Sequence, residues 1–297
     1  MSIQRVTQSM MSQRSLEGLQ LSLGRLARSQ EQLSTGRVLN RPSDSPTDTT
    51  AAMRLRSSLA DAKQYVRNAE DGQGWLGQVD TALQSMVNET RRARELVLQG
   101  ANQGAMSVAA REALAIEVEQ LRESLIGQAN AKYLERPVFG GVTAGSVAFD
   151  ADGAYVGTDA GEVLRTVGDG VSVRVDMDAR QAFGPDGANL FDDLDAAVNA
   201  LRSGDPAELS ASLDRLAEAG NRMTGALAEI GGRTNRLEAA LLRAQDGELS
   251  MTSSLSEIEN VDLPRAMVDL QLQEVAYQAA LGATARVLQP SLLDFLR

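Results

Sequence analysis

The sequence has no cysteine and no histidine, and only ten of its 297 residues are aromatic. Without cysteine the chain can form no disulfide, no thiolate nucleophile and no cysteine-ligated metal site. Without histidine it lacks the usual acid/base group near neutral pH and the commonest metal ligand. Lysine is scarce as well, with Lys63 and Lys132 the only two. These absences argue against an enzyme, and we expect no catalytic residue, no cofactor and no metal.

Long hydrophobic runs are also missing. No uninterrupted apolar stretch reaches the roughly 18 residues that a membrane span needs, and residues 1–15 lack the apolar core of a secretory signal. We therefore expect no membrane insertion and no cleaved signal peptide. Hydrophobic residues still make up 43% of the chain, enough for a core. With so few aromatics, that core should come from Leu, Val, Ala and Met packed helix on helix.

The charge is negative overall and unevenly distributed. The net charge is −11, yet residues 1–60 hold eight arginines and four acidic residues, whereas residues 145–200 hold eleven acidic residues and three arginines. An acidic total argues against nucleic acid as the main partner. A block of acids is most often a solvated face, and we favour that interpretation over a metal site.

The N-terminal segment has the pattern of an amphipathic helix. Its leucines recur with heptad spacing, interrupted once by Gln30. They are Leu16, Leu19, Leu23, Leu26 and Leu33. Gly36 predicts the end of this helix, and two prolines keep residues 40–46 from continuing it. Ser45 as N-cap, followed by Pro46 and Asp48, predicts a new helix start.

The middle of the chain is predicted to be helical on both sides of a β-rich insert. Helical periodicity covers residues 47–98, 108–130 and about 190–255, although Gly72, Gly74 and Gly77 weaken the case for one unbroken first helix. Between these segments, 163–167 and 171–175 predict two strands around a tight turn. The expected fold is mainly α, a long helical bundle with coiled-coil-like terminal helices and a small β-rich inserted domain.

The C-terminal segment carries a second heptad seam. Its members are Met267, Leu270, Glu274, Tyr277, Leu281, Thr284 and Leu288. A second apolar row beside it predicts a helix that can contact more than one neighbour. Two interpretations remain open: the terminal helices pack on each other or on the bundle, or other subunits complete their apolar faces.

Three motifs with possible binding roles have better structural explanations. The pattern G-x-G-x-x-G at 72–77 follows a helical segment rather than a strand, which argues against nucleotide binding. The calcium-loop-like start at Asp150 and Asp152 lacks its closing glutamate, so turn residues are favoured. Asp192, Asp193 and Asp195 are interpreted as helix-capping acids.

Ordered motifs at both ends of the chain resemble the bacterial flagellin superfamily. They include a loop with Asn40, Arg41, Pro42, Ser43 and Asp44, a helical motif with Asn235, Arg236 and Leu237, and an ending with Leu293, Asp294, Phe295 and Leu296. The loop and the ending are similar to those of the hook–filament junction branch, the hook-associated proteins, rather than to filament flagellin. The motifs lie within about 1–141 and 225–297.

The resemblance implies a structural protein of the bacterial flagellum, located outside the cell after export without a cleaved signal. It implies a terminal region (1–44 with 260–297) in the inner layer of the assembly, a helical bundle (45–136 with 188–259) and an outward-facing insert (137–187). The implied partners are further copies in a ring, the first hook-associated protein, flagellin and a cytoplasmic export chaperone. We further expect that the isolated monomer leaves its ends disordered and that deleting residues 142–185 permits assembly.

Two other interpretations remain open. Filament-forming flagellin is the alternative within the same superfamily. A cytosolic helical-bundle signalling or binding module is the alternative of another class, and it would not be secreted.

Overall fold

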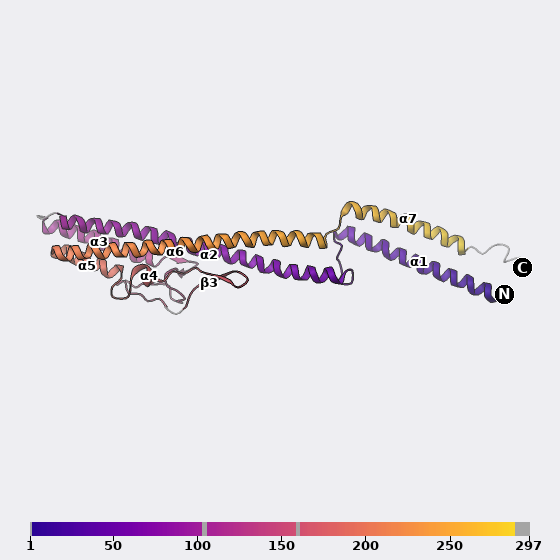
Figure 1. The fold of residues 1–297 in the computed structure, drawn as a ribbon, viewed down its shortest axis with the longest axis horizontal. Coiled ribbons are helices and arrows are strands. Elements are labelled where there is room, and N and C mark those ends of the chain that lie inside the picture. The colour runs from indigo at the N-terminus through magenta and orange to yellow at the C-terminus, as the bar shows by residue number, and fades with distance from the viewer. Residues whose placement is uncertain (1, 103–105, 159–160, 289–297) are drawn as a thin grey trace. The chain divides into compact units, whose positions relative to one another are not determined.

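The computed structural model describes residues 2–102, 106–158 and 161–288 (Figure 1). Helices dominate, and the chain divides into two compact units. The terminal unit consists of Met1–Ala60 with Leu249–Arg297, and the central unit is Asp61–Glu248. The prediction of a mainly α fold with a small β-rich region is confirmed.

The terminal unit is built around the first and last helices of the chain. Helix α1 (Ser2–Thr35) packs alongside α7 (Leu263–Leu288), and Figure 1 shows the two side by side. The unit also contains the beginning of α2 (Pro46–Asn102) and the end of α6 (Pro206–Glu259). The predicted start of α2 is present: the Asp48 N–H donates to Ser45 Oγ over 3.4 Å, and Ser45 Oγ donates to the Asp48 carboxylate over 2.7 Å.

The central unit contains the rest of α2 and α6 together with α3 (Val108–Ala129) and α5 (Leu190–Ser203). Helices α3 and α5 pack against each other. Asn189 and Asp192 form a full capping box at the start of α5, as the acidic run 192–195 suggested. Leucine, valine, alanine and methionine supply most of the buried core, in agreement with the composition.

The insert between α3 and α5 forms two small antiparallel sheets and a short helix. Strands β1 (Lys132–Tyr133) and β2 (Arg136–Pro137) pair in one sheet, and β3 (Leu164–Gly168) and β4 (Val171–Arg174) pair in the other with a bulge near Gly168. Helix α4 (Ala179–Phe183) follows. The hairpin expected from 163–167 and 171–175 is therefore present.

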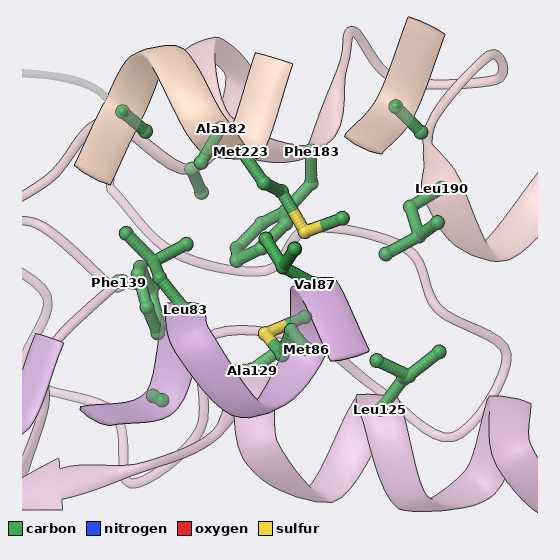
Figure 2. Packing of buried hydrophobic residues seen from close by; sticks show 14 of the residues in the cluster. Leu83, Met86, Val87, Leu125, Ala129, Phe139, Ala182, Phe183, Leu190 and Met223 are labelled. Carbon is green, nitrogen blue, oxygen red and sulfur yellow. The ribbon is translucent and has the colours of Figure 1, made fainter. Parts of the chain in front are cut away.

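Phenylalanine is concentrated where the insert meets the bundle. Phe149 makes edge-to-face contacts with Phe183 and Phe191, and Phe139 does so with Phe183, at ring-centroid distances of 5.0–5.6 Å. Figure 2 shows Phe139 and Phe183 among Leu83, Val87 and Met223 of α2 and α6. The sequence did not predict this aromatic centre.

Gly72 and Gly74 of α2 are contact points rather than breaks, whereas Gly77 has no close neighbour. A Cβ on Gly74 would lie 2.5 Å from the Tyr133 hydroxyl, and one on Gly72 would lie 3.1 Å from Leu237. Helix α2 therefore continues through residues 72–77, because close packing offsets the low helix propensity of glycine. This position inside a helix also leaves no strand–turn–helix context for nucleotide binding.

The β1–β2 turn has an unusual backbone. Its two central residues, Leu134 and Glu135, have φ values of 47° and 64°. Two-residue hairpin turns of this kind normally use asparagine and glycine, because a side chain in the left-handed region costs roughly 1–2 kcal/mol per residue. The tip of this hairpin is therefore strained.

Candidate assembly surface

Helix α1 turns one face toward α7. A row of partly covered residues on α1 recurs at intervals of four and three, and its members are Ser15, Leu19, Ser22, Leu26, Ser29 and Leu33. On α7 the matching row is Ala266, Leu270, Gln273, Tyr277, Ala280 and Thr284. On α1 serine alternates with leucine, and α7 places alanine at Ala266 and Ala280; these small side chains allow the two backbones to approach closely. Of the predicted seam residues, Leu19, Leu26, Leu33, Leu270 and Tyr277 lie in this interface.

Four of the other predicted seam residues lie outside the α1–α7 interface, and the structure does not describe the side chain of the fifth, Leu288. Leu16 and Leu23 on α1 are 52% and 49% exposed, and Met267 and Leu281 on α7 are 56% and 44% exposed. Leu288 is the last residue of α7. Exposed apolar side chains also occupy the side of α7 away from α1, namely Val268, Leu272 and Val275. The terminal helices therefore pair with each other and still present apolar faces outward.

A groove of about 430 Å³ runs along the same helix pair. Small side chains form much of its lining, with Ser15, Gly18 and Ser22 on α1 and Ala280 and Ala283 on α7. Leu21, which is 65% exposed, stands beside them. The pair thus offers both a hollow and protruding apolar side chains, the two elements that complementary helix packing requires.

Two connecting segments of the terminal unit, residues 36–38 and 259–261, are held together by backbone hydrogen bonds, and we call this pairing the linker staple. The Val38 N–H donates to the Glu259 carbonyl over 2.8 Å, and the Val261 N–H donates to the Gly36 carbonyl over 3.0 Å. The Glu259 carboxylate, only 7% exposed, pairs with Arg56 of α2 at 2.7 Å. These contacts fix the point where α1 and α7 leave α2 and α6.

The family motif loop is a closed turn next to this staple. The Asp44 N–H donates to the Arg41 carbonyl over 3.0 Å across Pro42 and Ser43, with proline at its favoured turn position. The Asp44 carboxylate accepts the N–H groups of Asn40 at 3.2 Å and Arg41 at 2.8 Å. The Asn40 side-chain amide donates to the Arg37 carbonyl over 3.1 Å, so the side chains of both Asn40 and Asp44 stabilise this turn.

The family motif helix has one buried and two exposed members. Leu237 is fully buried against α2 near Gly72, whereas Asn235 and Arg236 are exposed. The neighbouring Arg233 is 6% exposed and donates to the Asp176 carbonyl over 2.6 Å, which ties the insert to α6. Sequence reasoning did not identify Arg233, because a buried arginine in a polar helical stretch gives no periodic signal. The C-terminal motif, Leu293 to Leu296, lies outside the described residues.

A second residue to which sequence reasoning assigned no structural role is Asn130, at the end of α3. Its side-chain oxygen accepts the N–H groups of Ala148 and Phe149, and its amide nitrogen donates to the Phe149 carbonyl. This clip holds the start of the insert against the bundle. Asp150 in turn accepts the N–H groups of Asp152 and Ala154, so the calcium-loop-like segment is a turn, as expected.

Two aspartates of α5 have altered ionisation. Burial raises the pKa of Asp193, while the nearby guanidinium groups of Arg222 and Arg215 act in the opposite direction. Burial likewise raises the pKa of Asp195, which pairs with Arg122 at 2.8 Å. Each aspartate faces arginine in a structural ion pair. Among the described residues no cluster of three acids could hold a metal ion.

No helix in the described part of the chain has both the length and the apolar content needed to cross a bilayer. The features that remain prominent are the apolar faces of α1 and α7, at the two ends of the chain.

Comparison with known proteins connects both ends of the chain to flagellar proteins. Residues 6–134 match the bacterial flagellin N-terminal helical region, and residues 213–296 match the bacterial flagellin C-terminal helical region. Flagellar hook-associated protein 3 of Escherichia coli strain K12 is 26% identical over 94% of this chain and 95% of its own length. The flagellar filament 33 kDa core protein of Treponema phagedenis is 25% identical over 97% of both chains.

The fold is also similar to that of a solved structure. A Vibrio parahaemolyticus protein identified provisionally as a flagellar hook-associated protein superposes with a TM-score of 0.67 at 26% identity. The match covers 73% of this chain and 100% of that one.

Proposed function

Because the chain belongs to the bacterial flagellin family, we propose that it is a structural component of the flagellum that forms the junction between hook and filament. The similarity to hook-associated protein 3 extends along nearly the whole of both chains. This supports a role for the entire subunit rather than for one shared region. We propose no catalytic role.

The observation that carries the proposal is the exposed apolar surface of the terminal helices. Leu16, Leu23, Met267, Val275 and Leu281 remain 44–65% exposed although α1 and α7 already pair. Burying one such side chain fully contributes about 1.5–3 kcal/mol, so contacts with neighbouring copies can offset the cost of association. The terminal region, residues 1–44 with 260–297, would thereby polymerise into the inner layer of a ring.

The same proposal assigns partners and place. The ring would contact the first hook-associated protein on one side and flagellin on the other, with the acidic insert, 137–187, facing outward. Before assembly the subunit would leave the cell through the flagellar export route, and a cytoplasmic chaperone would cover the apolar face of α7. The exposed apolar side chains of α7 support the proposal that a chaperone binds this face before assembly.

Deletion of the gene in motile cells tests the function. We expect hooks without filaments and flagellin released into the medium, with filaments restored when the full-length gene is returned. Normal filaments in the deletion strain would overturn the junction role. Growth of long filaments from the purified protein alone would instead support the filament-forming alternative, to which the Treponema relative draws attention.

A further inference from the structure

The tip of the β1–β2 hairpin displays a leucine and a glutamate in a strained turn. Leu134 and Glu135 both have positive φ, and Leu134 is 73% exposed, the most exposed large apolar residue among the described residues between α3 and α5. No ion pair or hydrogen bond engages the Glu135 carboxylate within the described ranges. The subunit alone therefore gains nothing from these two side chains that would offset the strain. Backbone strain of this kind persists where a functional contact requires it.

A groove elsewhere in the central unit has the complementary chemistry. It lies between α2 and α6, has a volume of about 310 Å³, and is lined in part by Ala217, Gly220 and the buried Leu216. Arg91, Arg94 and Asn221 also line it. In the described part of the chain neither arginine has an ion-pair or hydrogen-bond partner, whereas Arg92 between them pairs with Glu117 at 2.8 Å. The groove thus combines two small lining residues, Ala217 and Gly220, with two positive charges that no described residue pairs.

A buried hydroxyl in the groove lacks a partner as well. Thr90 is 2% exposed, and its Oγ1 makes no hydrogen bond with any described residue. Thr224, across the groove, instead donates to the Gly220 carbonyl over 2.8 Å, as helical threonines commonly do. An unpaired buried polar group is costly unless a ligand or a partner completes it.

We propose that Leu134 and Glu135 of one copy insert into the α2–α6 groove of the next copy, with the leucine against Ala217 and Gly220 and the carboxylate at Arg91 and Arg94. This inference rests on the proposed function, since it requires that copies of the chain assemble. The small lining residues leave space for the leucine, and the charges of Glu135 and the two arginines are complementary.

The occupant of the groove must come from another copy. Tyr133, next to the tip, packs on Gly74, whereas the groove is lined by residues 90–94 of the same helix. At a rise of 1.5 Å per residue these positions lie roughly 25–30 Å apart along α2, beyond the reach of a two-residue turn. A tip that binds a groove of a different copy makes a head-to-tail contact, which repeats around a ring.

Variants of the tip separate assembly from folding. Glu135→Gly and Leu134→Asn supply residues that favour this turn, so each should raise the thermal midpoint of the purified subunit, by about 2–4 °C per relieved residue. In the gene-deletion strain they should restore far fewer filaments than the wild type. Full restoration by both stabilised variants would overturn the inference.

Charge reversal then tests the pairing itself. Glu135→Arg and Arg94→Glu should each reduce filament restoration, and the double variant should recover it at least in part. Asp169→Arg, at the exposed tip of the β3–β4 hairpin, is the matched control and should behave as the wild type. Additive defects in the double variant would count against direct pairing.

Cross-linking gives the decisive result, because the natural chain has no cysteine. Flagella carrying Leu134→Cys with Thr224→Cys should yield a ladder of disulfide-linked multimers after oxidation, and either single variant should not. Absence of a ladder in flagella that contain the subunit would overturn this contact and leave the junction role intact. If the wild-type gene fails to restore filaments in the deletion strain, the junction role itself is wrong.

Discussion

The central and terminal units use the same apolar residue types with opposite outcomes. In the central unit, leucine, valine and phenylalanine side chains enclose one another, and Trp75, Leu83 and Phe183 are at most 1% exposed. In the described part of the terminal unit, the only buried hydrophobic residues are Ala52 and Ala266. The central unit therefore has a closed hydrophobic core, whereas most large apolar side chains described in the terminal unit remain at least partly exposed.

In this chain, therefore, a segment can form a regular helix without burying its apolar side chains. Helices α1 and α7 are regular and paired, yet most of their large apolar side chains face outward. Packing of a helix face, rather than helix propensity, supplies most helical stability in proteins. The terminal unit should therefore depend on neighbouring copies and the central unit should not.

The largest expected effect is a complete loss of incorporation when the exposed face of α7 is charged. Leu281→Asp should leave the purified subunit folded, since the side chain is already 44% exposed, but a carboxylate cannot be buried between copies at low cost. Motility and the presence of the protein in isolated flagella measure the effect. Gln278→Asp, at an exposed polar position of the same helix, is the control. Normal motility with Leu281→Asp would contradict the comparison.

The second effect concerns the core of the central unit. Phe183→Ala should lower the free energy of unfolding by about 3–5 kcal/mol, because it leaves a cavity among Phe139, Phe149 and Phe191. Leu272→Ala on α7, where the side chain is 64% exposed, should change it by less than about 0.5 kcal/mol. Denaturant unfolding of the purified subunits measures both. Equal losses would show that the terminal unit has a closed core after all.

A third effect is confined to the linker staple. Arg56→Gln removes the partner of the buried Glu259 carboxylate and should weaken the local structure by about 1–3 kcal/mol. Faster hydrogen exchange at the Val38 and Val261 amides would report the loss. Arg54→Gln, an exposed neighbour on α2, should leave those amides unchanged. Identical exchange in both variants would show that the two backbone hydrogen bonds suffice.

The smallest effect is a pH dependence in the central unit. Burial raises the pKa of Asp193 in the folded state above the ordinary value of about 3.9, so the folded chain binds this proton more tightly than the unfolded one. The contribution of Asp193 to stability is therefore present below pH 4 and is lost as the pH rises through the folded pKa. The thermal midpoint of Asp193→Asn, measured relative to that of the wild type, should rise between pH 4 and pH 7. Parallel profiles would contradict this sign.

The structure changes one expectation about the insert. From the sequence, residues 142–185 looked removable without loss of assembly. They include Phe149, Val163, Val175, Met177 and Phe183, all of which belong to the buried core of the central unit. Arg233 and Asn130 also bind backbone of this segment. We now expect the deletion to unfold the central unit, because the bundle and the insert share one core.

Periodicity predicted the helices better than their contacts. Both terminal helices and the start of α2 follow from heptad spacing, proline and N-cap chemistry. The prediction used only the leucines, however, so it grouped Leu16 and Leu23 with Leu19 and Leu26. In the structure, leucine alternates with serine on the face of α1 that meets α7. The seven-residue spacing of Ser15, Ser22 and Ser29 was the available signal. Burial of Arg233 or the aromatic centre depends on long-range packing and leaves no local pattern.

The pairing of α1 with α7 has a kinetic consequence. The first and last helices are separated by nearly the entire chain, and all of Asp61–Glu248 lies between the segments that they bring together. Closing so long a loop in an unfolded chain carries an entropic cost that grows with its length, and such contacts form late. Once the central unit has folded, α2 and α6 return the two connections to one place and the effective loop becomes short. Helices α1 and α7 should therefore pair last. A subunit whose central unit is still unfolded should have no ordered α1–α7 pair that a neighbouring copy can bind.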